Sequence, residues 1–306
     1  MQAQVLSAVV KRVNIARTIN NGQKYITDLK YVYNGRIAVS VENTKVTNPS
    51  CLFRDDSIPF LSTHGSCLCV YTDGNSYARF FFWNICDRSV KKCTRSFTYT
   101  SYPLPGQLYD SDKIYSVWPL PVVDKSGYTK WPDELTRGYT PNGLAMCKSG
   151  AILVCLWNQQ VHKRSQGKVL KLSNDGCKLF EMETDKNRPL FVCPTYVTEN
   201  GNEDICVSDV NAVVVTDAGG FLRFRYTGTQ SDPQFDPYGI CCDSKNNIIV
   251  AEMVKNRIHM IDPNGELLHY IKYKDMHMPR VLCIDEHDNL YIGEWLSEEI
   301  KVLSLQ

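Results

Sequence analysis

The fold is decided by residues 237–270, which read PYGICCDSKNNIIVAEMVKNRIHMIDPNGELLHY. The pattern returns 42 residues later without a gap, as Pro279, Asp285, Asn289, Glu294, Ile300 and Leu303 in place of Pro237, Asp243, Asn247, Glu252, Ile258 and Ile261. A period of about 40 to 45 residues with several short strands is typical of a propeller blade, a four-stranded sheet that buries both faces only by stacking on its neighbours. The sequence therefore predicts an all-β propeller.

Earlier copies of this unit bring the predicted number of blades to six in one domain, residues 1–306. The four upstream blades are expected at residues 25–59, 65–102, 141–181 and 196–226. Residues 103–138 match no repeat, and we interpret them as a long connecting loop anchored by aromatic side chains. The last repeat ends after its third strand, so residues 3–15 are predicted to supply the fourth strand and close the ring.

The composition is that of an ordinary globular protein, with 306 residues, 43% hydrophobic residues, 22% charged residues and a formal net charge of +1. The 13 cysteines include no Cys-x-x-Cys pair, which argues against a zinc finger and favours buried thiols. Neither a signal peptide nor an 18-residue apolar segment is present in the sequence. We expect a reducing, cytoplasmic setting, no membrane partner and no cofactor.

Two motifs carry a resemblance to a known family. Val250-Ala-Glu252 followed by Asn256-Arg-Ile258 resembles the NHL repeat, and residues 199–228 look like the C-terminal NHL propeller of invertebrate tripartite-motif (TRIM) proteins. The resemblance implies a six-bladed propeller that binds a protein or RNA, often as the target-recognition part of a ubiquitin ligase. The cysteine and histidine ligands of a RING finger are not found, so ligase activity of this chain alone is not expected.

An acidic residue follows the second strand of most predicted blades, as at Asp73, Asp209, Glu252 and Glu294. Because these acids repeat with the fold, we interpret them as acceptors for the backbone of the following turn. The alternative is a metal-dependent hydrolase resembling the gluconolactonase propellers, with ligands around 199–203. No nucleophile motif accompanies the six histidines, so the sequence predicts a chain that is not an enzyme, with neither catalytic nor metal residues.

Strand topology gives the candidate binding site. The chain enters each first strand at the rim that also carries the turn between the second and third strands. This rim is predicted to bind a protein partner, because aromatic, Met and Arg side chains gather on it. The candidates are Asn142, Trp157, His162, Lys163, Arg164, Tyr238, Met253, Lys255, Arg280 and Trp295.

RNA is the alternative partner. Arg88, Lys91, Lys92 and Arg95 are basic residues that would contact phosphates, together with the basic pair at 163–164. The near-neutral net charge weighs against this alternative.

Overall fold

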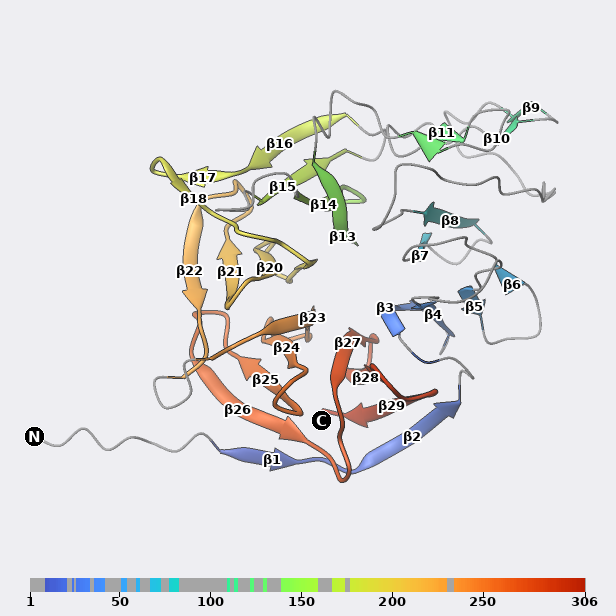
Figure 1. The fold of residues 1–306 in the computed structure, drawn as a ribbon, viewed down its shortest axis with the longest axis vertical. Helices are drawn as coiled ribbons and strands as arrows, with labels where there is room; N and C mark the ends of the chain where they lie inside the picture. Colours follow the sequence, from blue (N-terminus) through green and yellow to red (C-terminus); the bar gives the residue numbers. More distant parts are fainter. Residues whose placement is uncertain are drawn as a thin grey trace, which may run out of the picture.

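The described part of the protein is built from β-strands and contains no helix. A computed structural model describes residues 9–20, 24, 26–33, 36–41, 51–53, 59–60, 67–72, 77–82, 109–110, 113–114, 122–123, 129–130, 139–158, 167–173, 177–229 and 234–305. Within these ranges, no helix is long and apolar enough to cross a membrane. The predicted all-β propeller is confirmed, with its sheets arranged around a ring (Figure 1).

Four consecutive sheets form the part of the ring whose side chains are described. Their strands are β13 (Thr140–Met146), β14 (Ile152–Trp157), β15 (Gly167–Leu172) and β16 (Lys178–Met182); β19 (Tyr196–Glu199), β20 (Ile205–Asp209), β21 (Ala212–Thr216) and β22 (Leu222–Tyr226); β23 (Pro237–Cys242), β24 (Ile248–Glu252), β25 (Arg257–Ile261) and β26 (Leu267–Lys272); and β27 (Pro279–Ile284), β28 (Asn289–Glu294) and β29 (Glu299–Ser304). In Figure 1 the first strands β13, β23 and β27 lie toward the centre, whereas β16, β22 and β26 form the circumference.

The rest of the ring is described by its backbone. A four-stranded sheet joins β3 (Ile26–Tyr33), β4 (Arg36–Val41), β5 (Cys51–Phe53) and β6 (Pro59–Phe60). Strand β7 (Cys67–Thr72) pairs with β8 (Tyr77–Phe82). Short pairs are formed by β9 (Tyr109–Asp110) with β10 (Lys113–Ile114), β11 (Val122–Val123) with β12 (Thr129–Lys130), and β17 (Thr184–Asp185) with β18 (Arg188–Pro189). Strands β3 to β8 lie where the first two blades are predicted, and β9 to β12 lie within residues 103–138, which match no repeat. The count of six blades stays a prediction, because much of 31–138 lies outside the described residues.

The N-terminal segment closes the ring, but through a strand that begins where the predicted range 3–15 ends. Strand β2 (Ile15–Asn20) pairs antiparallel with β29 as the missing outer strand of the last blade. Strand β1 (Val10–Arg12), which lies inside the predicted range 3–15, instead pairs parallel with β26 as a fifth strand of the preceding blade. The N-terminal segment thus adds an outer strand to two successive blades, pairing with β26 in one and with β29 in the next.

Each blade forms because apolar strands alternate with turns that satisfy their own backbone. In the first hairpin of two blades, Asp243 and Asp285 accept the backbone N–H of Asn247 and Asn289 at 2.8 Å. The asparagine side chain returns a 2.8 Å bond to the same aspartate. The second strands between these turns are buried, with Val250 fully covered. The repeated Asp and Asn positions therefore set the turns, and the residues between them form the core between blades.

Neighbouring inner strands approach closely at a glycine. A Cβ atom on Gly239 would lie 2.7 Å from the carbonyl oxygen of Arg280 and from Cα of Val281. A Cβ on Gly143 would lie 2.2 Å from the carbonyl oxygen of Thr195. Only a residue without a side chain fits there, so the Pro-x-Gly sequence holds the start of one inner strand against the next.

Candidate functional site

The mouth face is the face of the ring on which the inner strands begin. The turns between second and third strands, 210–211, 253–256 and 295–298, lie on the same face because the strands of each blade are antiparallel. Pro237 pairs with Glu252 and Pro279 with Glu294, which brings each inner-strand start beside its own blade's turn. The mouth face is therefore the rim on which the sequence places its candidate residues.

Three of the candidates contact one another at the channel. The guanidinium carbon of Arg280 lies 3.8 Å from the centre of the Trp295 ring and 5.5 Å from that of Tyr238. All three side chains are partly exposed. The Nε atom of Arg280 is buried and has no hydrogen-bond partner among the described residues. Since Tyr238 and Arg280 come from neighbouring blades, this cluster requires the close approach at Gly239.

A second tyrosine completes the cluster. Burial raises the pKa of Tyr196, and the charge and hydrogen bond of Arg280 oppose that rise. Burial also raises the pKa of Tyr238, where the nearby Asp236 adds to the rise and Arg280 again opposes it. The sequence analysis did not select Tyr196, because Thr195 rather than a proline stands directly before it. We call Tyr196, Tyr238, Arg280 and Trp295 the arginine cluster.

Four other candidates, Asn142, Trp157, Met253 and Lys255, lie on the mouth face without joining the arginine cluster. The Asn142 amide donates to the carbonyl oxygen of Pro194 at 3.1 Å, which links two blades. Trp157 ends β14, and its buried Nε1 has no hydrogen-bond partner among the described residues. Lys255 forms an ion pair of 3.2 Å with Glu252, beside the partly exposed Met253. The candidates His162, Lys163 and Arg164 lie outside the described residues, as do the four basic residues at 88–95 considered for RNA.

Two of the repeated acids, Asp209 and Glu294, bind the backbone of the linker that precedes their blade. Asp209 accepts the backbone N–H groups of Val192 and Cys193 at 2.8 and 2.6 Å. Glu294 accepts the backbone N–H of His277 at 2.7 Å. Both partners belong to the linker that precedes the blade. Asp209 also makes the predicted contact with the following turn, through the backbone of Val210. The linker contacts are additional, and the sequence spacing alone does not reveal them.

Glu252 differs from its equivalents because it is surrounded by basic side chains. Its carboxylate is 1% exposed and contacts Arg257, His259 and Lys255. Burial alone would raise the pKa of Glu252, but the hydrogen bonds and charges of His259 and Arg257 outweigh burial and lower it. His259 is fully buried, 2.8 Å from Glu252 through Nε2 and 2.8 Å from the Tyr226 hydroxyl through Nδ1. All three groups are satisfied when Nε2–H donates to Glu252 and Tyr226 donates to Nδ1.

Exposed aliphatic side chains also lie on the mouth face. Val210, Val254 and Leu296 occupy the turns after the second strand in three successive blades and are 45%, 68% and 44% exposed. Sequence reasoning missed these residues because it looked for aromatic and charged side chains. Their signal in the sequence is an aliphatic residue one or two positions after each repeated acid.

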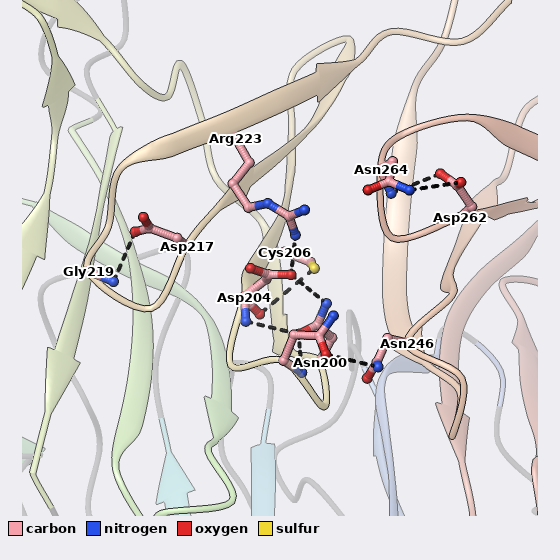
Figure 2. A network of polar contacts seen from close by, with 10 residues as sticks. Asn200, Asp204, Cys206, Asp217, Gly219, Arg223, Asn246, Asp262 and Asn264 are labelled. Atoms are coloured by element: carbon pink, nitrogen blue, oxygen red, sulfur yellow. Dashed lines mark hydrogen bonds and ion pairs between the residues drawn. The ribbon is translucent and has the colours of Figure 1, made fainter.

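The opposite face carries polar contacts among its hairpin turns (Figure 2). The side-chain oxygen of Asn200 accepts the backbone N–H groups of Asn202 and Asp204, each at 2.9 Å. Asp204 also forms an ion pair with Arg223, and Asn246 of the next blade donates to Asn202 at 3.2 Å. The residues at 199–203 considered as metal ligands thus lie in one hairpin. Within the described ranges, no three His, Cys, Asp or Glu side chains form a group that could hold a metal.

Comparisons with known proteins identify the fold and no family. No protein-family model matches the chain, and no curated protein matches its sequence. Virginiamycin B lyase from Staphylococcus aureus is similar in structure, with a TM-score of 0.53 and 15% identity over 93% of this chain and 83% of that one. Regucalcin, a calcium-binding protein from Agrobacterium tumefaciens, gives a TM-score of 0.58 and 11% identity over 97% and 95% of the two chains. The WD40 propeller domain of Doa1 gives 0.52 and 10% over 95% and 97%.

These likenesses correct one prediction and leave another untested. The prediction that the chain is not an enzyme is wrong, because the comparisons bring it together with an enzyme, virginiamycin B lyase, on the same scaffold. A missing sequence motif therefore does not exclude catalysis on this fold. No comparison supports the NHL repeat assignment or a role in a TRIM-type ligase.

Proposed function

We propose that the mouth face is a docking surface for a protein partner. The observation that carries this proposal is the row of exposed aliphatic side chains, Val210, Val254 and Leu296, on three successive blades beside the arginine cluster. Apolar side chains around an aromatic and Arg centre are typical of protein interfaces. A reducing, cytoplasmic setting belongs to the proposal and is supported by the free thiols of the cysteines from 147 to 283.

The test removes the aliphatic row and keeps the cluster. Peptides that bind the wild-type chain are first selected from a displayed random library, and their affinities are then measured for the triple variant V210S/V254S/L296S. Each covered aliphatic side chain contributes about 1 kcal/mol, so the triple change is expected to weaken binding by about 100-fold.

The matched control changes three other exposed apolar residues. Leu179, Phe221 and Leu268 are 54%, 69% and 46% exposed and lie at the start of outer strands, near the opposite face. The triple variant L179S/F221S/L268S is expected to bind the selected peptides like the wild type. Equal loss in both variants, or no loss in the first, would overturn the proposal.

A second candidate function is catalysis on a small molecule bound at the same mouth. The comparisons favour this function over the ligase scaffold, because a lyase shares the fold over most of the chain. In the described ranges no carboxylates converge as the hydrolase hypothesis requires, so no catalytic step through a metal is derived. The Tyr196 hydroxyl and the Arg280 guanidinium are the polar groups at the mouth that would orient a substrate.

Turnover tests this second function. The purified chain is incubated with a panel of lactones, esters and cyclic depsipeptides, with and without added divalent cations, and products are followed by mass spectrometry. Catalysis at the mouth predicts turnover that falls at least 10-fold in R280K and is unchanged in the surface variant R188K. Turnover that R280K leaves intact would exclude the mouth as the active site.

A further inference from the structure

Arg280 has no acidic partner among the described residues, whereas several other cations of the blades do. Arg223 pairs with Asp204, and Lys171 pairs with Glu199 at 3.1 Å. Arg257 likewise pairs with a carboxylate on β24. Among the described residues, no carboxylate forms an ion pair with Arg280, and its buried Nε has no hydrogen-bond partner. The guanidinium therefore retains unused donor capacity in a partly dehydrated site.

The rings around Arg280 determine how a ligand can approach it. The guanidinium carbon lies over the Trp295 ring, 3.8 Å from its centre, and over the Tyr238 ring, 5.5 Å from its centre. Contacts of this kind hold the side chain in place and do not use its N–H groups as hydrogen-bond donors to oxygen. A guanidinium fixed in one plane matches the two oxygens of a carboxylate, which it binds through paired hydrogen bonds.

Two acids lie near the cluster and act on its tyrosines. Asp236 accepts a hydrogen bond from Tyr238, which opposes the effect of burial on the pKa of Asp236. Asp28 acts on Tyr196 through its charge and adds to the rise of that tyrosine's pKa. Asp236 thus orients the Tyr238 hydroxyl next to Arg280. Among the ion pairs of the described residues, neither acid is paired with Arg280.

We propose that the arginine cluster is a carboxylate-binding site, with Arg280 as the bidentate donor and the Tyr196 hydroxyl beside it. The inference rests on the proposed function in that the carboxylate is an acidic side chain of the docked protein segment. Trp295 and Tyr238 pack against the aliphatic part of that side chain, and the aliphatic row holds the residues that flank it.

The test uses small probes that do not need the aliphatic row. N-acetyl-glutamate is titrated at constant ionic strength into the ¹⁵N-labelled full chain, and the arginine Nε–H signals are followed by NMR. The amide N-acetyl-glutamine is the neutral probe, and phenyl phosphate is the competing anion. The Arg280 signal is assigned by its absence in R280K, and R188K serves as the control for an exposed arginine.

A saturable shift of the Arg280 signal with N-acetyl-glutamate, and none with N-acetyl-glutamine, is expected. R280K keeps the positive charge but loses the planar guanidinium that donates paired hydrogen bonds. Its affinity for the probe, read from the Trp295 indole signal, is therefore expected to fall at least 10-fold. Thermal melting shows whether R280K is folded. No saturable shift, equal affinity in R280K, or tighter binding of phenyl phosphate would each overturn the assignment.

The two proposals fail separately. The variant V210S/V254S/L296S is expected to bind N-acetyl-glutamate like the wild type, because it keeps all four residues of the arginine cluster. Docking that depends on the aliphatic row, without a response of Arg280 to the probe, would refute the carboxylate site and leave the docking surface in place.

Discussion

Changing Glu252 to Gln is expected to destabilise the protein much more than the same change at Glu294. In E252Q the Arg257 guanidinium, 12% exposed, and the fully buried His259 lose the carboxylate that both contact. Removing one partner of a buried ion pair leaves the other charge without compensation. Lys255 is 26% exposed and remains in contact with water, so it adds little.

The expected magnitudes follow from the contacts at each position. Breaking a buried pair costs about 3 kcal/mol or more. In E294Q the amide oxygen still accepts the bonds that Oε1 accepts from the Tyr273 hydroxyl and the His277 N–H, so only about 1 kcal/mol is lost. For a chain of this size each kcal/mol lowers the Tm by about 2 °C. We therefore expect Tm to fall by about 6 °C in E252Q and by about 2 °C in E294Q.

The assay is thermal and urea unfolding of both variants, followed by near-ultraviolet circular dichroism at pH 7.5. The two positions are equivalent in the repeat, so changes in helix or strand propensity cancel in the comparison. A Tm for E252Q within 2 °C of that for E294Q would show that the basic residues around Glu252 do not depend on its charge.

Three further predictions concern pH, ring closure and packing. Burial lowers the pKa of His259, so the contribution of the neutral imidazole to stability is present above about pH 6.5 and is lost as the pH falls below that value. H259Q is therefore expected to show a smaller fall of Tm between about pH 7 and pH 5 than the wild type. An equal fall of Tm in both proteins would contradict this. Deleting residues 1–21 removes β1 and β2 and should lower Tm more than deleting 1–13, which leaves β2 paired, as differential scanning fluorimetry would show; equal losses would contradict the closure by β2. G239A should lower the free energy of unfolding by about 2 kcal/mol, because the new Cβ meets rigid backbone at 2.7 Å. In the control G219A the nearest atoms to the new Cβ are side-chain atoms at 3.3 Å. Urea unfolding compares the two variants, and equal stability would contradict the close approach at Gly239.

Glu252 and Glu294 show which part of the structure the sequence predicts and which part it does not. The 42-residue displacement places Glu252 and Glu294 in equivalent positions, and the structure confirms both at the ends of second strands. The sequence does not reveal that one binds a linker N–H while the other binds three basic side chains. The partner of Glu294 comes from the linker before its blade, whereas the partners of Glu252 come from the turn and the third strand of its own blade. The shared spacing does not show which kind of partner each acid binds.

The sequence by itself determined the repeat, and with it the strands and turns of the last blades. This is possible because strand alternation and Asp-to-Asn turns are local properties of the chain. Only the tertiary structure decided that Arg280 lies between Tyr238 and Trp295, and that β2 rather than residues 3–15 closes the ring. Both depend on how closely neighbouring blades pack, which is set at positions such as Gly239 by backbone atoms more than 40 residues away in the chain.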